Sequence, residues 1–219
     1  MSGADSAAGG GWLDLDDWRR RAHFEHFRAM PYPWFSLTVQ MDATRLWHAS
    51  REPGGPSFFL ATVFLAMRAA NATRALRLRL RGEKVWIHDR IHASSTILRP
   101  DDTFGFARLD STERFADFSV MGRSAIERAR GGQGLGGEPG RDDLIYHSTL
   151  PWLNFTAFSN PRAAHDDCIP RIVFGACTST GSGWHMPMSV EVHHALVDGL
   201  DVARFVERFQ NELSAPALD

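Results

Sequence analysis

The chain has few cysteines, one lysine and no long hydrophobic run, and these shortages exclude several classes of protein. Two cysteines among 219 residues, Cys168 and Cys177, cannot build a disulfide framework or a four-thiolate metal site. The 24 basic and 26 acidic residues are spread along the chain, so no basic tract favours a nucleic-acid partner. No stretch approaches the roughly 20 apolar residues that cross a membrane, and the first residues lack the pattern of a signal peptide. We therefore expect a cytoplasmic protein with neither nucleic acid nor membrane as a partner.

The aromatic residues point instead to a large core. Seven tryptophans and 15 phenylalanines stand against two tyrosines, and rings of this size need a core or a ligand cleft to cover them. The hydrophobic fraction of 43% and the charged fraction of 23% are those of a globular protein. Residues 1–11 are small and predict a flexible N-terminus, and residues 12–219 predict a single domain.

Hydrophobic periodicity predicts an α+β protein, because strands and helices mix along one chain with several hairpins. We expect a mostly antiparallel or mixed sheet with helices on one face. A glycine-rich segment, 131–140, lacks the residues of a phosphate-binding loop and predicts a surface loop. The predicted helices cover 14–30, 56–71, 113–130 and 200–213, and the predicted strands cover 35–41, 76–80, 84–88, 93–98, 144–158, 171–178 and 186–193.

The segment with a chemical signature follows the last predicted strand. It reads Ser-Val-Glu-Val-His-His-Ala-Leu-Val-Asp-Gly from Ser189, and it leads into the C-terminal helix. Imidazole is the side chain best suited to accept a proton near neutral pH. Adjacent side chains at a strand end point in opposite directions, so only one of His193 and His194 should line a cleft. We assign that role to His194 and a structural role to His193.

Three blocks of this sequence together resemble the chloramphenicol acetyltransferase family. The blocks are the run from Met186 through the paired histidines to Leu213, the segment Trp18–Glu25, and the segment Ser148–Phe155. They fall in the family's order and spacing. The resemblance implies the family's two-layer α/β sandwich and an acyl transfer from acetyl-CoA as a cosubstrate, with no tightly bound cofactor and no metal. It also implies a homotrimer whose active sites lie between subunits.

The resemblance further implies a role for individual residues. His194 becomes the general base that takes the acceptor's proton, and Ser148 becomes the hydroxyl that stabilises the oxyanion. Asp198 pairs with Arg20 to hold the catalytic loop. The remaining assignments are Trp152 and Phe158 as walls of a coenzyme channel, unless they are core aromatics, and His26, Phe27, Phe35, Tyr146, Asn160 and Val173 as the acceptor site.

The acceptor positions depart from the family's apolar pattern. Asn160 and Arg162 stand where aliphatic residues are usual, and Val173 replaces a threonine. Polar groups in a pocket select acceptors that satisfy them. The acceptor is therefore chloramphenicol or a more polar hydroxyl or amine, with the acyl group coming from coenzyme A or a carrier protein.

A non-catalytic ligand-binding or metal-binding protein is the alternative from another class. His185, His193 and His194 lie on or next to the last predicted strand, but no metal-ligand spacing supports a zinc site.

Overall fold

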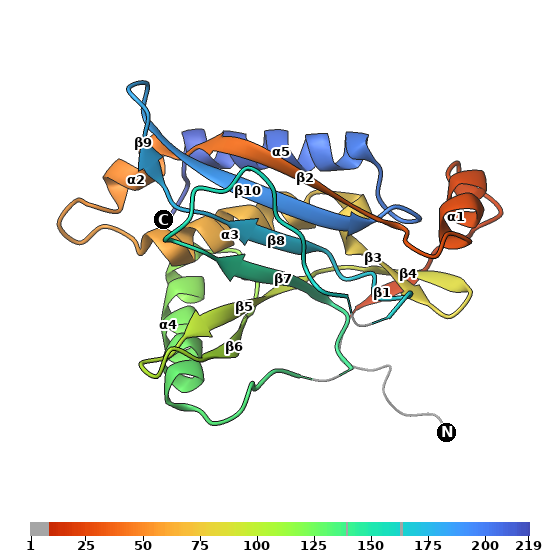
Figure 1. Cartoon of the computed structure of the whole chain (residues 1–219), viewed down its shortest axis with the longest axis horizontal. Coiled ribbons are helices and arrows are strands. Elements are labelled where there is room, and N and C mark those ends of the chain that lie inside the picture. The colour runs from red at the N-terminus through yellow and green to blue at the C-terminus, as the bar shows by residue number, and fades with distance from the viewer. Residues whose placement is uncertain (1–8, 139, 163) are drawn as a thin grey trace.

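The computed structural model describes residues 9–138, 140–162 and 164–219 (Figure 1). Its main sheet has the strand order β2-β10-β8-β7-β5-β6, with β9 beside β10. The β5–β7 and β7–β8 pairs are parallel and the others are antiparallel, so the sheet is mixed, as expected. The strands are β2 (Trp34–Asp42), β5 (His92–Leu98), β6 (Phe104–Leu109), β7 (Leu144–Thr149), β8 (Arg171–Phe174), β9 (Thr178–Ser179) and β10 (Trp184–His193).

A small second sheet and the helices complete the architecture. The small sheet has the order β1-β4-β3, with strands β1 (Gly10–Trp12), β3 (Leu78–Arg81) and β4 (Lys84–His88). The helices are α1 (Arg21–Arg28), α2 (Thr44–Ala49), α3 (Phe58–Asn71), α4 (Phe115–Gly131), α5 (Gly199–Ser214) and the short 3-10 helix η1 (Arg74–Arg77). No helix among the described residues combines the length and the apolarity needed to cross a membrane.

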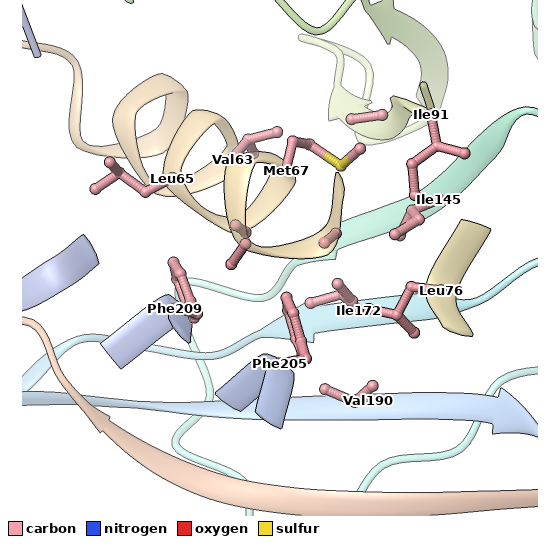
Figure 2. Close-up of a cluster of buried hydrophobic side chains, with 14 of the residues drawn as sticks. Val63, Leu65, Met67, Leu76, Ile91, Ile145, Ile172, Val190, Phe205 and Phe209 are labelled. Atoms are coloured by element: carbon pink, nitrogen blue, oxygen red, sulfur yellow. The ribbon is translucent and has the colours of Figure 1, made fainter. Parts of the chain in front are cut away.

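The core lies between the main sheet and the long helices. Helix α3 is apolar on nearly all sides because α4 and α5 flank it, and the Ser57 side chain caps its first turn by accepting from the amide of Leu60. In β10 the alternating residues Met188, Val190 and Val192 are buried in the core. Figure 2 shows the α3 side chains Val63 and Met67 above the α5 ring Phe205, with Ile172 of β8 beside this ring and Val190 of β10 below it.

The opposite side chains of the same strands form what we call the open face. It carries Ser148, Val173, Ser189 and Glu191, with no long helix on it (Figure 1). Residues 150–162 and 164–170 cross this face, and Phe158 is anchored there because its carbonyl accepts from the Ser189 hydroxyl at 3.3 Å. The sheet therefore presents one face to the core and one face to a loop.

Three sequence predictions need correction. The strand predicted over 144–158 ends at Thr149, since Pro151 has no amide proton to continue a ladder. The helix predicted over 14–30 begins only at Arg21 and ends at Arg28. The strand predicted over 171–178 ends at Phe174, and helix α2 and strand β6 were not predicted.

The N-terminus and the glycine-rich loop have different outcomes. Residues 1–8 of the predicted flexible segment 1–11 lie outside the described residues, whereas Gly10 and Gly11 already pair with β4. The described residues of the predicted loop 131–140 form a loop from residue 132 onward, and residue 139 lies outside the description. The carbonyl of Leu135 accepts from the amide of Phe106 at 2.8 Å, which holds this loop against the edge strand β6.

A buried histidine behind Ser148 makes stability depend on pH. His147 is 2% exposed, stacks on Phe174, and neither ring nitrogen has a hydrogen-bond partner in the described chain. Burial lowers its pKa to about 3. Below pH 6.5 the unfolded chain binds a proton at this ring that the folded chain does not bind, so the free energy of unfolding falls as the pH drops.

We predict that His147→Leu flattens this pH dependence. Between pH 7 and pH 5 the wild-type protein should lose about 2 kcal/mol through this residue, and the variant should not. Urea unfolding at several pH values and one protein concentration measures the slope. The same substitution at the exposed His48 is the control. Equal slopes for wild type and His147→Leu would contradict the assignment.

Candidate functional site

The turn after β10 is held by an arginine from the other end of the chain. Arg20 donates to both carboxylate oxygens of Asp198, at 2.7 and 2.6 Å, and also to the carbonyls of His194 and Ala195. Burial opposes ionisation of Asp198, but the hydrogen bonds and charge of Arg20 outweigh it and hold the carboxyl pKa below its ordinary value. The sequence prediction that these two residues pair is confirmed, and the pair fixes the path of the turn.

His194 sits at the start of this turn between two aromatic rings. Its ring stacks on Phe27 with centroids 3.7 Å apart and an interplanar angle of 11°, and Phe35 lies 4.7 Å away. The Nδ1 atom is buried 3.3 Å from Asp198 Oδ1 without a hydrogen bond, while the side chain as a whole stays 31% exposed. The described structure therefore leaves the Nε2 edge as the accessible side of the ring.

The neighbouring residues divide into a buried and an exposed histidine. His193 is 1% exposed, packs against Trp34, and has a pKa lowered to about 4 by burial. A neutral, covered imidazole agrees with the structural role expected for it. His26 is exposed on α1 and touches the edge of Phe27, so it borders the His194 cluster.

Ser148 lies on the open face within a row of paired residues. Its neighbour on β8 is Val173, and on β5 the hydroxyl of Thr96 donates to Ser148 Oγ at 3.2 Å. Tyr146 lies two residues earlier on the same face, next to Arg171 of β8. The structure thus brings three predicted residues together here, Ser148, Tyr146 and Val173.

The strand register keeps Ser148 away from His194 within one chain. Ser148 pairs with Val173, and Val173 pairs with Ser189, so two strand spacings separate Ser148 from Ser189. His194 follows Ser189 by five residues along and just beyond β10. With strands about 4.8 Å apart and a rise of about 3.3 Å per residue, the two side chains lie on the order of 20 Å apart. The surroundings of Ser148 and those of His194 are therefore separate within one chain, and we call them the two half-sites of the predicted site.

A cleft of about 740 Å³ opens beside the Ser148 half-site. Its lining includes Thr96 and Thr149, the 64% exposed Trp152, and the exposed side chains of Arg51 and Arg123. The cleft is lined by residues of α2, α3, α4 and β5 and by the segments that follow β7 and β8. The predicted channel residue Trp152 is one of its walls. Phe158 does not line it and lies instead on the open face.

A charged cluster covers part of the open face next to Tyr146. Glu191 of β10 is 4% exposed and forms an ion pair with Arg162 from the crossing segment at 2.6 Å. The amide of Asn160 donates to the same carboxylate at 2.9 Å, and Arg171 lies against the ring of Tyr146. Asn160 therefore helps to hold the crossing segment, and its side-chain Nδ2 is buried without a partner in the described chain.

The three histidines considered as metal ligands do not meet. His185 and His193 stand near opposite ends of β10, and His194 turns away toward Phe27. Within residues 9–138, 140–162 and 164–219, no group of three or more histidine, cysteine or acidic side chains is placed to hold a metal ion.

Comparison with known proteins identifies the family. The family model for chloramphenicol acetyltransferase matches residues 11–210. The chain is 30% identical to chloramphenicol acetyltransferase 3 of Escherichia coli over 203 residues, which are 90% of this chain and 94% of the relative. It is 29% identical to the chloramphenicol acetyltransferase of Streptomyces acrimycini over 213 residues, which are 94% of each chain. The chain belongs to the chloramphenicol acetyltransferase family. It is accordingly an acyltransferase.

Solved structures agree on the fold. A chloramphenicol acetyltransferase superposes with a TM-score of 0.84 at 23% identity and covers 94% of this chain and 100% of its own. A probable dihydrolipoamide acetyltransferase from Listeria monocytogenes gives a TM-score of 0.66 at 14% identity, with 90% and 93% covered. The predicted two-layer sandwich of the chloramphenicol acetyltransferase type is therefore confirmed.

Sequence analysis missed two neighbours of the predicted site residues. Thr96 sits in a short strand of ordinary composition, and only the β5–β7 register brings it beside Ser148. The Arg162–Glu191 pair joins residues 29 positions apart. The only sign of it in the sequence is that the two side chains carry opposite charges.

We predict that the Arg20–Asp198 pair acts as a coupled unit in this acyltransferase. Arg20→Ala and Asp198→Ala should each lower the free energy of unfolding by about 1–3 kcal/mol, because each leaves a partly buried charge unpaired. The double variant should lose less than the sum of the two. Urea unfolding measures all three proteins, and Arg19→Ala, at an exposed neighbour, is the control. Additive losses would show that the two charges act independently.

Proposed function

We propose that this protein is a coenzyme A-dependent O-acetyltransferase that acts as a homotrimer with its active sites between subunits. The single observation that carries the proposal is the separation of the two half-sites. One chain holds His194 at the end of β10 and Ser148 in the middle of the open face, with two strand spacings and five residues between them. A second copy of the chain supplies the missing half. The segment 12–219 then acts as a single acyltransferase domain.

In this proposal each half-site has one chemical task. The Nε2 atom of His194 takes the proton of the acceptor hydroxyl while its oxygen forms a bond to the thioester carbonyl carbon. Ser148 donates to the carbonyl oxygen, where the negative charge develops. When the electron pair of the oxyanion re-forms the carbonyl, the carbon–sulfur bond breaks and the thiolate receives the proton from His194. Asp198 and Arg20 keep the imidazole in place and do not take part in the proton transfer.

The cleft beside Ser148 supports an anionic thioester donor. Arg51 and Arg123 stand exposed at its outer part, and neither has a carboxylate partner among the described residues. Arg51 lies over the ring of Trp47 with 3.9 Å between the guanidinium carbon and the ring centroid, which orients its charge. Arginine binds the phosphates of acetyl-CoA well. In this proposal the narrow pantetheine arm lies along the cleft and brings the thioester to Thr96 and Thr149.

The charged cluster on the open face favours an acceptor other than chloramphenicol. Tyr146, Arg171 and Glu191 lie in one cross-strand row next to the row of Ser148. Glu191 and Arg171 are already paired with Arg162 and Asp167, but an apolar nitrophenyl ring set against this row would leave the Tyr146 hydroxyl without a partner. A polar hydroxyl or amine acceptor satisfies it, with the acetyl chemistry unchanged.

We predict that two inactive variants restore activity in each other. His194→Ala should lower kcat by about 100-fold or more, and Ser148→Ala by about 100-fold, because they remove the base and the oxyanion donor. In a mixed trimer, one interface in three pairs the intact histidine of one subunit with the intact serine of the next. Statistical mixing should therefore recover about a quarter of the wild-type rate. Thiol release from acetyl-CoA measures the rate, and mass spectrometry verifies the hybrids.

The control is a mixture of His194→Ala with the double variant His194→Ala/Ser148→Ala, which has no intact pair at any interface. Verified hybrids without recovered activity would show that the site lies within one chain or uses other residues.

We predict that chloramphenicol is a poor acceptor. Its kcat/KM should be at least about tenfold below that of the best polar hydroxyl or amine acceptor in a panel assayed with acetyl-CoA, because an apolar ring would desolvate the Tyr146 hydroxyl without giving it a hydrogen bond. Thiol release with each acceptor gives the values, and growth of expressing cells on chloramphenicol gives an independent measure. Efficient turnover with protection of the cells would instead make chloramphenicol the acceptor.

A further inference from the structure

We propose that Thr96 is a positioning residue that turns the hydroxyl proton of Ser148 toward the reacting carbonyl. The proposal rests on the proposed function, since it needs Ser148 as the oxyanion donor. The observation is the hydrogen bond from Thr96 Oγ1 to Ser148 Oγ, 3.2 Å long, in which threonine donates and serine accepts.

The sheet register creates this contact. Strands β5 and β7 are parallel with Ser95 beside His147, so the next residues along, Thr96 and Ser148, are neighbours on the open face. Threonine is branched at Cβ, which restricts its side-chain rotamers in a strand. The Thr96 hydroxyl therefore has few orientations, and in the one observed its proton is directed to a lone pair of the serine oxygen.

The other side of Ser148 offers nothing to compete for its proton. The facing residue on β8 is Val173, which has no polar atom. Within the part of the chain that the structure describes, Ser148 Oγ makes no hydrogen bond besides the one it accepts from Thr96. Ser148 therefore accepts a hydrogen bond on one side and meets an apolar side chain on the other. Its own hydroxyl proton stays available for a hydrogen bond to a ligand.

The location of Thr96 matches this role. Thr96 lines the cleft proposed for the thioester donor, and so does Thr149, the residue after Ser148. The carbonyl of a thioester that enters from the cleft arrives beside this hydroxyl pair. As the acceptor oxygen adds to the carbonyl carbon, the electron pair moves to the carbonyl oxygen, and Ser148 donates to it. Accepting from Thr96 polarises the serine hydroxyl and makes it a better donor. Thr96 itself stays outside the reacting atoms.

The test compares Thr96→Val with Thr96→Ser. Valine keeps the shape of threonine and removes the hydroxyl, whereas serine keeps the hydroxyl. We expect Thr96→Val to lower kcat about three- to tenfold with the KM for acetyl-CoA within twofold of wild type, and Thr96→Ser to restore most of the rate. The assay is thiol release from acetyl-CoA with chloramphenicol as the probe acceptor. Acetyl-CoA alone, whose hydrolysis passes through the same oxyanion, is the second probe.

Two further variants separate positioning from structure. Thr38→Val makes the same change in the same cross-strand row but on β2, away from Ser148, and should leave kcat unchanged. In a Ser148→Ala background, Thr96→Val should have no further effect on kcat, because there is no hydroxyl left to orient.

The outcomes divide clearly. A wild-type kcat for Thr96→Val, a change confined to KM, a failure of Thr96→Ser to restore the rate, or an equal loss in the Ser148→Ala background would each overturn the proposal. If Ser148→Ala alone keeps the wild-type kcat, the role of Ser148 in the proposed function fails, and the role of Thr96 fails with it. If Ser148→Ala is slow and Thr96→Val is not, only the role of Thr96 fails.

Discussion

The hydrogen-bond register of strands β7, β8 and β10 is the constraint on which the proposed active site depends. Ladder pairs fix Ser148 opposite Val173 and Val173 opposite Ser189, and the length of β10 then carries the chain to His194. A one-residue slip of β7 against its neighbours would turn Ser148 toward the core, so the buried residues of this strand protect the register. Because backbone ladders are rigid, the two groups cannot approach each other by a local movement. Association between chains is the route by which the proposed trimer would bring a His194 beside a Ser148.

The two half-sites are held in different ways. Ser148 stands on a strand with neighbours on both sides, and ladder hydrogen bonds alone hold its backbone. His194 stands on a turn, where the backbone carbonyls have no ladder to satisfy them. Arg20 fills that need by donating to the carbonyls of His194 and Ala195 as well as to the Asp198 carboxylate. A planar guanidinium with several donors suits such a task, and lysine would not replace it. The stack of His194 on Phe27 then fixes the plane of the imidazole.

Sequence patterns predicted the long elements and the histidine turn because each has a strong local cause. Helix α5 has a clear apolar stripe, and the pairing of Arg20 with Asp198 followed from the family resemblance. The failures had non-local causes. The run after Thr149 is as apolar as a strand, but Pro151 and the crossing of the open face give it another conformation. The contact between Thr96 and Ser148 depends on strands that are 52 residues apart in the chain, and no local periodicity encodes their register.

The open face carries a conflict between packing and recognition. Apolar residues would suffice to cover a sheet face in a trimer, yet this chain has Glu191 there. Arg162 forms an ion pair with its carboxylate, and the Asn160 amide donates a hydrogen bond to it. Removing one member of such a pair would strand a nearly buried charge, whereas replacing the whole set by aliphatic residues costs little or even stabilises a protein. Stability alone therefore gives no reason to keep the cluster. Its position in the row next to Ser148, beside Tyr146 and Arg171, gives a reason in the proposed acceptor site: charged groups already held in place can contact a polar acceptor without reorganisation.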